Sequence, residues 1–170
     1  MPEPLVSDST PLIALARIDR LDLLELLFGA VFIPPEVSKE ILSKGRSKRG
    51  RQALQAASWM TTHELAHPKS LELVSAALNQ GEREAIPLAR DLGRDLLIDD
   101  LAGRHEAERL NVRIVGSAGV LLQAKSESLI PDVAPILESL LGEGFYLSDE
   151  LHQTILRHAG EWEEDNTESD

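Results

Sequence analysis

The chain has 170 residues, enough for one domain with a buried core, and its 42% hydrophobic and 27% charged content is typical of a soluble globular protein. It contains no cysteine, which excludes disulfides and thiolate metal sites, and no apolar run approaches the ~20 residues that span a bilayer. The first residues, Met1-Pro2-Glu3-Pro4, lack the basic and apolar segments of a signal peptide. We therefore expect a cytoplasmic protein with no membrane association.

The net charge of −12 is distributed unevenly along the chain. Six of the 29 acids lie in the last ten residues, which contain no Lys or Arg. We expect one folded domain over residues 1–160, followed by an acidic, disordered tail over residues 161–170. An acidic chain is a poor non-specific binder of nucleic acid, because phosphate contacts depend on Lys and Arg.

In chain order, the first half predicts short strands alternating with helices. A buried strand at 5–7 leads into a helix at 10–16, with Pro11 near its start. The next expected elements are a leucine-rich helix from 19 or 20 up to Gly29, a strand at 30–33, a helix at 36–42, a basic connection at 44–51, a helix at 52–57 and a short strand at 59–61.

The second half predicts helices at 70–78 and 82–92, a strand at 95–98, a helix at 102–110, a strand at 112–115, and helices at 118–125, 131–141 and 148–158. No β-hairpin signal separates the strands. Alternation of this kind indicates an α/β protein, a three-layer α/β/α sandwich around a parallel sheet of 4–5 strands.

Acids follow two of the expected strands directly. Asp8 follows the first strand, and Asp99 and Asp100 follow the strand that ends at Ile98. The carboxyl ends of parallel strands form one edge of the sheet, where ligands bind. Carboxylates gathered there repel one another unless a hard divalent metal such as Mg²⁺ or Mn²⁺ is bound. Asp8 could equally serve as the N-cap of the next helix, and a cap would explain only one acid of the Asp99-Asp100 pair.

Acids on two of the expected helices are further candidate ligands. Glu40 lies beside apolar Val37 and Ile41, where it either has a partner or faces solvent. Glu82 and Glu84 open a helix, a common place for acids. Together with the strand-end acids they could hold one or two metal ions for phosphodiester hydrolysis.

Other chemical motifs are absent from the sequence. There is no Gly-rich nucleotide-binding loop and no His-Glu-x-x-His zinc motif. Ser117 lacks the surroundings of a serine nucleophile, and either caps a helix or contacts a phosphate. The segment Lys44 to Arg51 is the one dense cationic stretch, which could be a solvated loop, a clamp for nucleic-acid phosphates or a contact for an acidic partner.

Several stretches together resemble the PIN-domain superfamily of metal-dependent ribonucleases, and more specifically its DUF3368 group. No one stretch is specific, but their order and spacing across residues 5–158 are. They are Val6 to Leu15, Ile33 to Glu40, Gly81 to Ala85, Leu97 to Asp100, Val115 to Leu122 and Gly144 to Ser148.

The resemblance implies a parallel-sheet fold with an acidic metal pocket. It also implies cleavage of single-stranded RNA, a toxin role beside a small antitoxin, and a homodimer. Carried over, the acids are Asp8, Glu40, Glu84 (alternative Glu82) and Asp100 (alternative Asp99). The residues expected to contact substrate are Ser9, Ser117, Lys44, Arg46, Lys48, Arg49 and Arg51. Typical PIN toxins have Asp at the helical third position, where this chain has Glu.

Two other functions are weighed against the ribonuclease. A haloacid-dehalogenase-like phosphatase also has an Asp after its first strand, but it requires a second acid two residues later, where this chain has Thr10. A catalytically weak PIN-like module that binds nucleic acid or protein would explain the Glu substitution and the acidic balance.

Overall fold

The computed structural model describes residues 2–44 and 48–164, and for residues 44, 48 and 49 it describes the backbone alone. Within these residues five strands form one parallel sheet in the order β3-β2-β1-β4-β5. The strands are β1 (Leu5–Ser7), β2 (Val31–Ile33), β3 (Met60–Thr62), β4 (Leu96–Leu97) and β5 (Ile114–Val115). From β1 the sheet extends to β2 and β3 on one side and to β4 and β5 on the other, so the topological switch point lies between β1 and β4. Open α/β sheets bind ligands at such a point, at the carboxyl ends of the strands.

Helices connect and cover the strands. In chain order they are α1 (Ser9–Arg17), α2 (Asp22–Phe28), α3 (Pro35–Lys44), α4 (Lys48–Ala56), the 3₁₀ helix η1 (Pro68–Leu73), α5 (Gln80–Leu92), α6 (Leu101–Arg109), α7 (Ser117–Ser126), α8 (Ala134–Gly142) and α9 (Asp149–His158).

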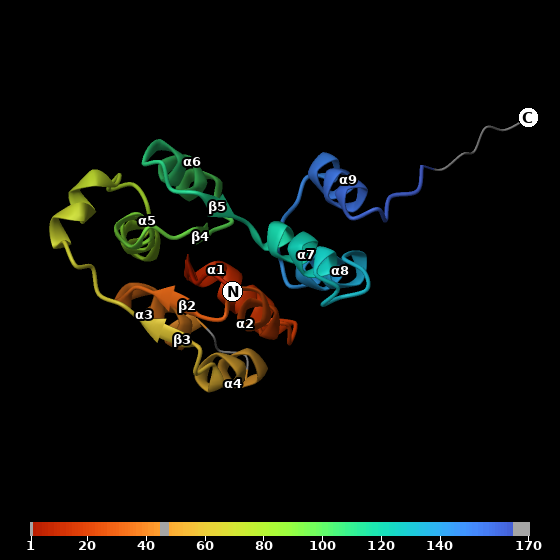
Figure 1. Cartoon of the computed structure of the whole chain (residues 1–170), viewed down its shortest axis with the longest axis horizontal. Coiled ribbons are helices and arrows are strands. Elements are labelled where there is room, and N and C mark those ends of the chain that lie inside the picture. Colours follow the sequence, from red (N-terminus) through yellow and green to blue (C-terminus); the bar gives the residue numbers. More distant parts are fainter. Residues whose placement is uncertain (1, 45–47, 165–170) are drawn as a thin grey trace, which may run out of the picture.

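The arrangement is the expected three-layer α/β/α sandwich. In Figure 1, α3 and α5 lie to the left of the strands, whereas α2 and α7 lie to the right. Helix α3 contacts α5, which contacts α6, and α2 contacts α7, which in turn contacts α8 and α9. Both faces of the sheet are therefore covered, which is why the strands read as continuous apolar runs: Leu5, Val6, Val31, Leu96 and Leu97 are all buried.

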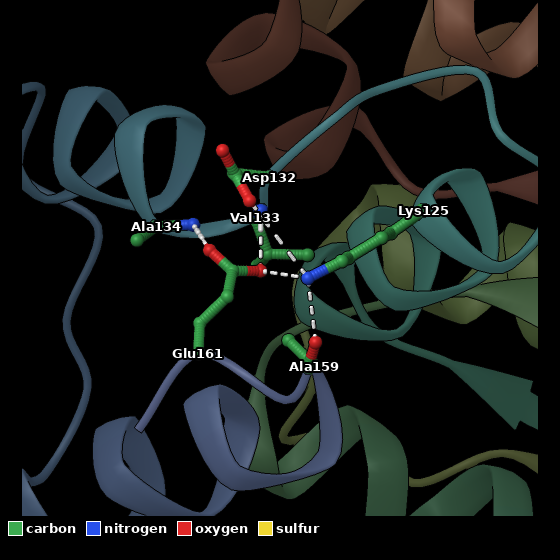
Figure 2. A network of polar contacts seen from close by, with 6 residues as sticks. All are labelled: Lys125, Asp132, Val133, Ala134, Ala159 and Glu161. Carbon is green, nitrogen blue, oxygen red and sulfur yellow. Dashed lines mark hydrogen bonds and ion pairs between the residues drawn. The ribbon is translucent and has the colours of Figure 1, made fainter. Parts of the chain in front are cut away.

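A polar network fastens the C-terminal end of the chain to the fold (Figure 2). The Glu161 carboxylate accepts hydrogen bonds from the backbone N–H groups of Val133 and Ala134, at 2.8 and 2.9 Å, and so caps α8. Lys125 of α7 donates to Glu161 at 2.9 Å and to the Ala159 carbonyl at 2.6 Å. The expected tail begins at residue 161, yet Glu161 is a fixed contact; residues 165–170 lie outside the described residues.

Two expected elements differ from the structure. The helix expected over residues 70–78 is wrong: a short 3₁₀ helix, η1, ends at Leu73, and the segment that follows is not helical. Only Ser70 and Val74 of this segment are buried, so no apolar face is available to stabilise a longer helix. The basic connection is shorter than expected, because α3 extends to Lys44 and α4 begins at Lys48. No described helix is long and apolar enough to cross a membrane.

Candidate functional site

Strands β1 and β4 bring their acids to the same crevice. The strands pair directly, with Ser7 opposite Leu97, and the Asp8 N–H donates to the Leu97 carbonyl at 3.0 Å. Asp8 follows β1 immediately, and Asp99 and Asp100 lie just beyond the end of β4. The topology thus brings together the acids that the sequence placed at strand ends.

Asp8 is buried, with 2% of its surface exposed. It occupies the N-cap position of α1, but its side chain makes no capping hydrogen bond, and its buried Oδ1 has no hydrogen-bond partner within the described part of the chain. Burial raises the pKa of Asp8 to about 6, the Ser9 N–H opposes this, and the charges of Glu40 and Asp100 add to it. A buried acceptor that the protein leaves unsatisfied indicates a missing cationic or donor partner.

Glu82 lies against Asp8 and Asp100 rather than serving the helix start. Asn79 caps α5 instead, accepting the Glu82 N–H at 2.9 Å. The Glu82 side chain is 4% exposed. Burial is the largest cause that raises its pKa to about 7; the charges of Asp8 and Asp100 contribute to the increase, and the contact with Asn79 opposes it. Two neighbouring carboxyl groups are a pair that a divalent cation can bind once Glu82 has released its proton.

Glu84, two residues further along α5, faces a different neighbour. Burial raises its pKa, whereas a hydrogen bond from the Glu36 N–H, at the start of α3, lowers it. The charges that act on Glu84 are those of Glu36, Lys39 and Glu40. Glu84 therefore packs toward α3, whereas Glu82 packs toward the crevice between β1 and β4.

Buried residues follow both glutamates along α5. Glu82 shares a helical face with Ala85, Ile86 and Ala89, which are all buried, at the i, i+3, i+4, i+7 spacing. Glu84 lies about 200° further around the helix axis, but its neighbours at i+3 and i+4, Pro87 and Leu88, are also buried. The apolar spacing alone therefore does not decide which glutamate points into the crevice.

Glu40 is held from two sides at the edge of this crevice. Ser9 of α1 donates a hydrogen bond from its hydroxyl to Oε2 of Glu40. Gly81 lies so close that a Cβ atom there would be 2.7 Å from Glu40 Oε1, so a larger residue would displace the Glu40 carboxylate from this position. Ser9 is buried, and because its hydroxyl donates to Glu40, it lies beside a candidate metal ligand.

Asp99 and Asp100 are consecutive but have different partners. Asp99 accepts from the N–H and the hydroxyl of Ser117, at 2.8 and 2.5 Å, and thereby ties the end of β4 to the start of α7. Burial raises the pKa of Asp99, opposed by Ser117 and by the charge of Arg104. Asp100 caps α6 by accepting the Gly103 N–H at 2.9 Å through Oδ2. One carboxylate oxygen of the exposed Asp100 therefore stays available beside Glu82.

Ser117 is fully buried, with both its hydroxyl and its N–H engaged by Asp99. Sequence reasoning did not single out Arg104, which lies beside Asp99 and Gly116. Its position one helical turn after Asp100 is the signal that could have found it, since residues i and i+4 share a helix face.

Arg51 is the one cation of the basic segment whose side chain the structure describes. Arg51 lines a cavity of about 180 Å³ between α3, α4 and β3, together with mainly apolar side chains. Arg46 and the side chains of Lys44, Lys48 and Arg49 lie outside the described residues. The phosphate-clamp hypothesis for this segment stays a prediction.

The acids supply oxygen ligands of the kind that Mg²⁺ and Mn²⁺ prefer. Among the described residues no group of three or more His, Asp or Glu side chains is already arranged as a metal site. The unsatisfied Oδ1 of Asp8 and the neighbouring carboxyl groups of Glu82 and Asp100 nevertheless fit a divalent cation by their chemistry.

Comparisons with known proteins agree with this architecture. The family model described as DUF3368, a PIN domain, matches residues 4–161. A similar solved structure is that of a PilT N-terminus domain protein from the hyperthermophilic archaeon Sulfolobus solfataricus P2. It is 15% identical, with a TM-score of 0.51, and the match covers 71% of this chain and 92% of that one. This likeness concerns the fold. No curated protein matches the chain.

Proposed function

Because the chain belongs to the DUF3368 family of PIN domains, we propose that it is a Mg²⁺- or Mn²⁺-dependent endoribonuclease that hydrolyses phosphodiester bonds of single-stranded RNA. The observation that carries the proposal is the buried Oδ1 of Asp8, which has no hydrogen-bond partner among the described residues and lies at the reversal of the strand order. A buried carboxylate oxygen without a partner is costly unless a cation binds it in the working state.

The proposed ligands are Asp8, Glu82 and Asp100, with Glu40 at the edge of the pocket. Glu82 is preferred to Glu84 as the helical acid, because the charges that raise its pKa are those of Asp8 and Asp100. Asp100 is preferred to Asp99, whose two oxygens already accept hydrogen bonds from Ser117.

A bound divalent cation would supply Lewis-acid stabilisation of the phosphate charge and lower the pKa of a water molecule. The protein's own part is to present ionised oxygens. Asp8 and Glu82 must release the protons that burial favours before they can act as ligands. Ser9 orients Glu40, and Ser117 holds Asp99 so that the loop after β4 stays fixed.

A cleavage assay tests the proposal. Mixed single-stranded RNAs are incubated with the protein and Mn²⁺ or Mg²⁺, with EDTA as the metal control. Asp8→Ala is expected to abolish cleavage while the circular dichroism spectrum stays native. The matched control is Asp22→Ala, which removes an exposed acid from α2 and is expected to cut like the wild type. Equal cleavage by Asp8→Ala would refute the assignment.

The acidic balance of the chain favours one second candidate, a PIN-like module that binds RNA or protein without cutting it. Tight Mn²⁺ binding, abolished in Asp8→Ala, with no RNA cleavage under either metal would favour it. The toxin role, a small antitoxin partner, a homodimer and a cytoplasmic location are predictions from the family resemblance and from composition. Co-purification with the product of an adjacent gene would test the antitoxin.

A further inference from the structure

Arg104 is a half-buried cation beside the acidic crevice. It lies on α6, and a Cβ atom at Gly116 would be 2.7 Å from its Nη1 and 3.1 Å from Asp99 Oδ1. The guanidinium therefore rests against the backbone at the start of α7, in a space that exists because residue 116 is glycine. Its charge acts on Asp99 from this position.

The donors of Arg104 have no acceptor within the chain as described. Neither a hydrogen bond nor an ion pair at contact distance reaches its guanidinium from any residue in 2–44 or 48–164. Asp99 does not need it, because Ser117 already donates to both Asp99 oxygens. An arginine side chain carries five N–H donors. A half-buried arginine whose N–H groups find no acceptor in the protein can donate them to a bound ligand.

The charge of the crevice indicates which acceptor. Asp8, Glu82 and Asp100 repel a phosphodiester, so RNA needs a cation near them in addition to any metal. Lys39, the cation beside Glu84, is exposed and pairs with Glu36 at 3.7 Å. Arg104 has no such pair among the described residues, and its planar guanidinium can bind two phosphate oxygens at once.

We infer that Arg104 binds an RNA backbone phosphate at the mouth of the acidic crevice, with Gly116 providing the room for its guanidinium. This inference rests on the proposed function, since the phosphate is that of the RNA substrate. Arg104, rather than the basic segment alone, then sets where the RNA backbone runs across the site.

The experiment measures binding of a short fluorescein-labelled oligouridylate by anisotropy across a salt series, with Ca²⁺ replacing Mn²⁺ to slow cleavage. Cleavage with Mn²⁺ and Mn²⁺ affinity by calorimetry are measured in parallel. The variants are Arg104→Gln and Arg104→Lys. The matched control is Arg113→Gln, which removes a cation that is 79% exposed and pairs with Asp95 at 3.0 Å.

Arg104→Gln is expected to weaken RNA binding about 10- to 100-fold, the effect of removing charge-assisted hydrogen bonds. The slope of log affinity against log salt should become shallower by about 0.7 for each phosphate that the protein no longer neutralises. Arg104→Lys should keep the wild-type slope but not the full affinity, because a lysine cannot bind two oxygens in one plane. Mn²⁺ affinity should be unchanged or higher, and Arg113→Gln should bind RNA like the wild type.

Wild-type affinity and slope in Arg104→Gln, with RNA still cut by the wild type, would overturn the inference and leave the proposed function standing. A wild type that neither binds nor cuts RNA would overturn both. A fall in Mn²⁺ affinity together with RNA affinity would also overturn the inference, since it would mean that Arg104 only supports the pocket. If Arg104→Gln does not fold, Arg104→Lys carries the test, and full RNA affinity in that variant overturns the inference.

Discussion

Replacing Asp8 with asparagine is expected to stabilise the metal-free protein at neutral pH. The carboxyl group is 2% exposed, and burial, opposed by the Ser9 N–H and increased by neighbouring acids, raises its pKa from 3.8 to about 6. Since each pKa unit corresponds to about 1.4 kcal/mol, ionised Asp8 lowers the free energy of unfolding by roughly 3 kcal/mol. Asparagine has nearly the same shape and no charge, so it removes this penalty without creating a cavity.

The gain must depend on pH with a definite sign. Well below pH 3.8 both the folded and the unfolded state hold the Asp8 proton, so the penalty vanishes. It grows as the unfolded chain ionises and is complete above the folded pKa of about 6. We therefore expect Asp8→Asn to gain roughly 3 kcal/mol near pH 8 and about half of that near pH 5.

Urea unfolding in EDTA, followed by circular dichroism at both pH values, measures the gain. A gain of this size near pH 8 corresponds to a Tm increase of about 6–12 °C for a chain of this length. Asp22→Asn, at an exposed acid, is the control and should change the unfolding free energy by less than ~1 kcal/mol. An Asp8→Asn variant that is less stable than the wild type near pH 8, or whose gain does not depend on pH, would show that the buried Asp8 carboxylate does not destabilise the fold.

The raised pKa values of Asp8 and Glu82 predict that Mn²⁺ binds more tightly as the pH rises through about 6 to 7, because both ligands must lose protons; calorimetry across pH measures this, and a flat affinity contradicts it. Gly81→Ala should displace Glu40, whose Oε1 would lie 2.7 Å from the new Cβ, and so weaken Mn²⁺ binding, although alanine has the higher helix propensity. A higher Tm with wild-type Mn²⁺ affinity would show that Glu40 is not needed for metal binding. Glu161→Gln should cost about 1–2 kcal/mol of unfolding free energy, because it weakens the α8 cap and removes an ion pair; an unchanged urea midpoint would refute this.

The sheet could be predicted from sequence because each strand is a short apolar run between turn or cap residues. The runs at residues 5–7, 30–33 and 95–98 match β1, β2 and β4 to within two residues at each end. The helix expected over residues 70–78 is wrong, although the leucines of this segment suggest an apolar face. Leu73 is exposed, Leu71 and Leu78 are half-buried, and Ser70 instead donates to Asp91.

The PIN-domain resemblance is confirmed, yet the site was predictable only in part. That acids would gather at the carboxyl edge follows from the parallel sheet. Which of Glu82 and Glu84 enters the crevice depends on the rotation of α5 about its axis, and packing of the whole layer sets that rotation. Which of Asp99 and Asp100 is free depends on Ser117, a residue distant in sequence, whose hydrogen bonds only the folded chain defines.

The most direct test of the central claim is to locate Mn²⁺ by its anomalous diffraction in crystals of the full chain. We expect an anomalous peak in the crevice between β1 and β4, ligated by Asp8, Glu82 and Asp100. A peak ligated by Glu84 with Glu82 uninvolved would contradict the ligand assignment. Crystals saturated with Mn²⁺ that show no peak at this edge of the sheet would contradict the metal site itself.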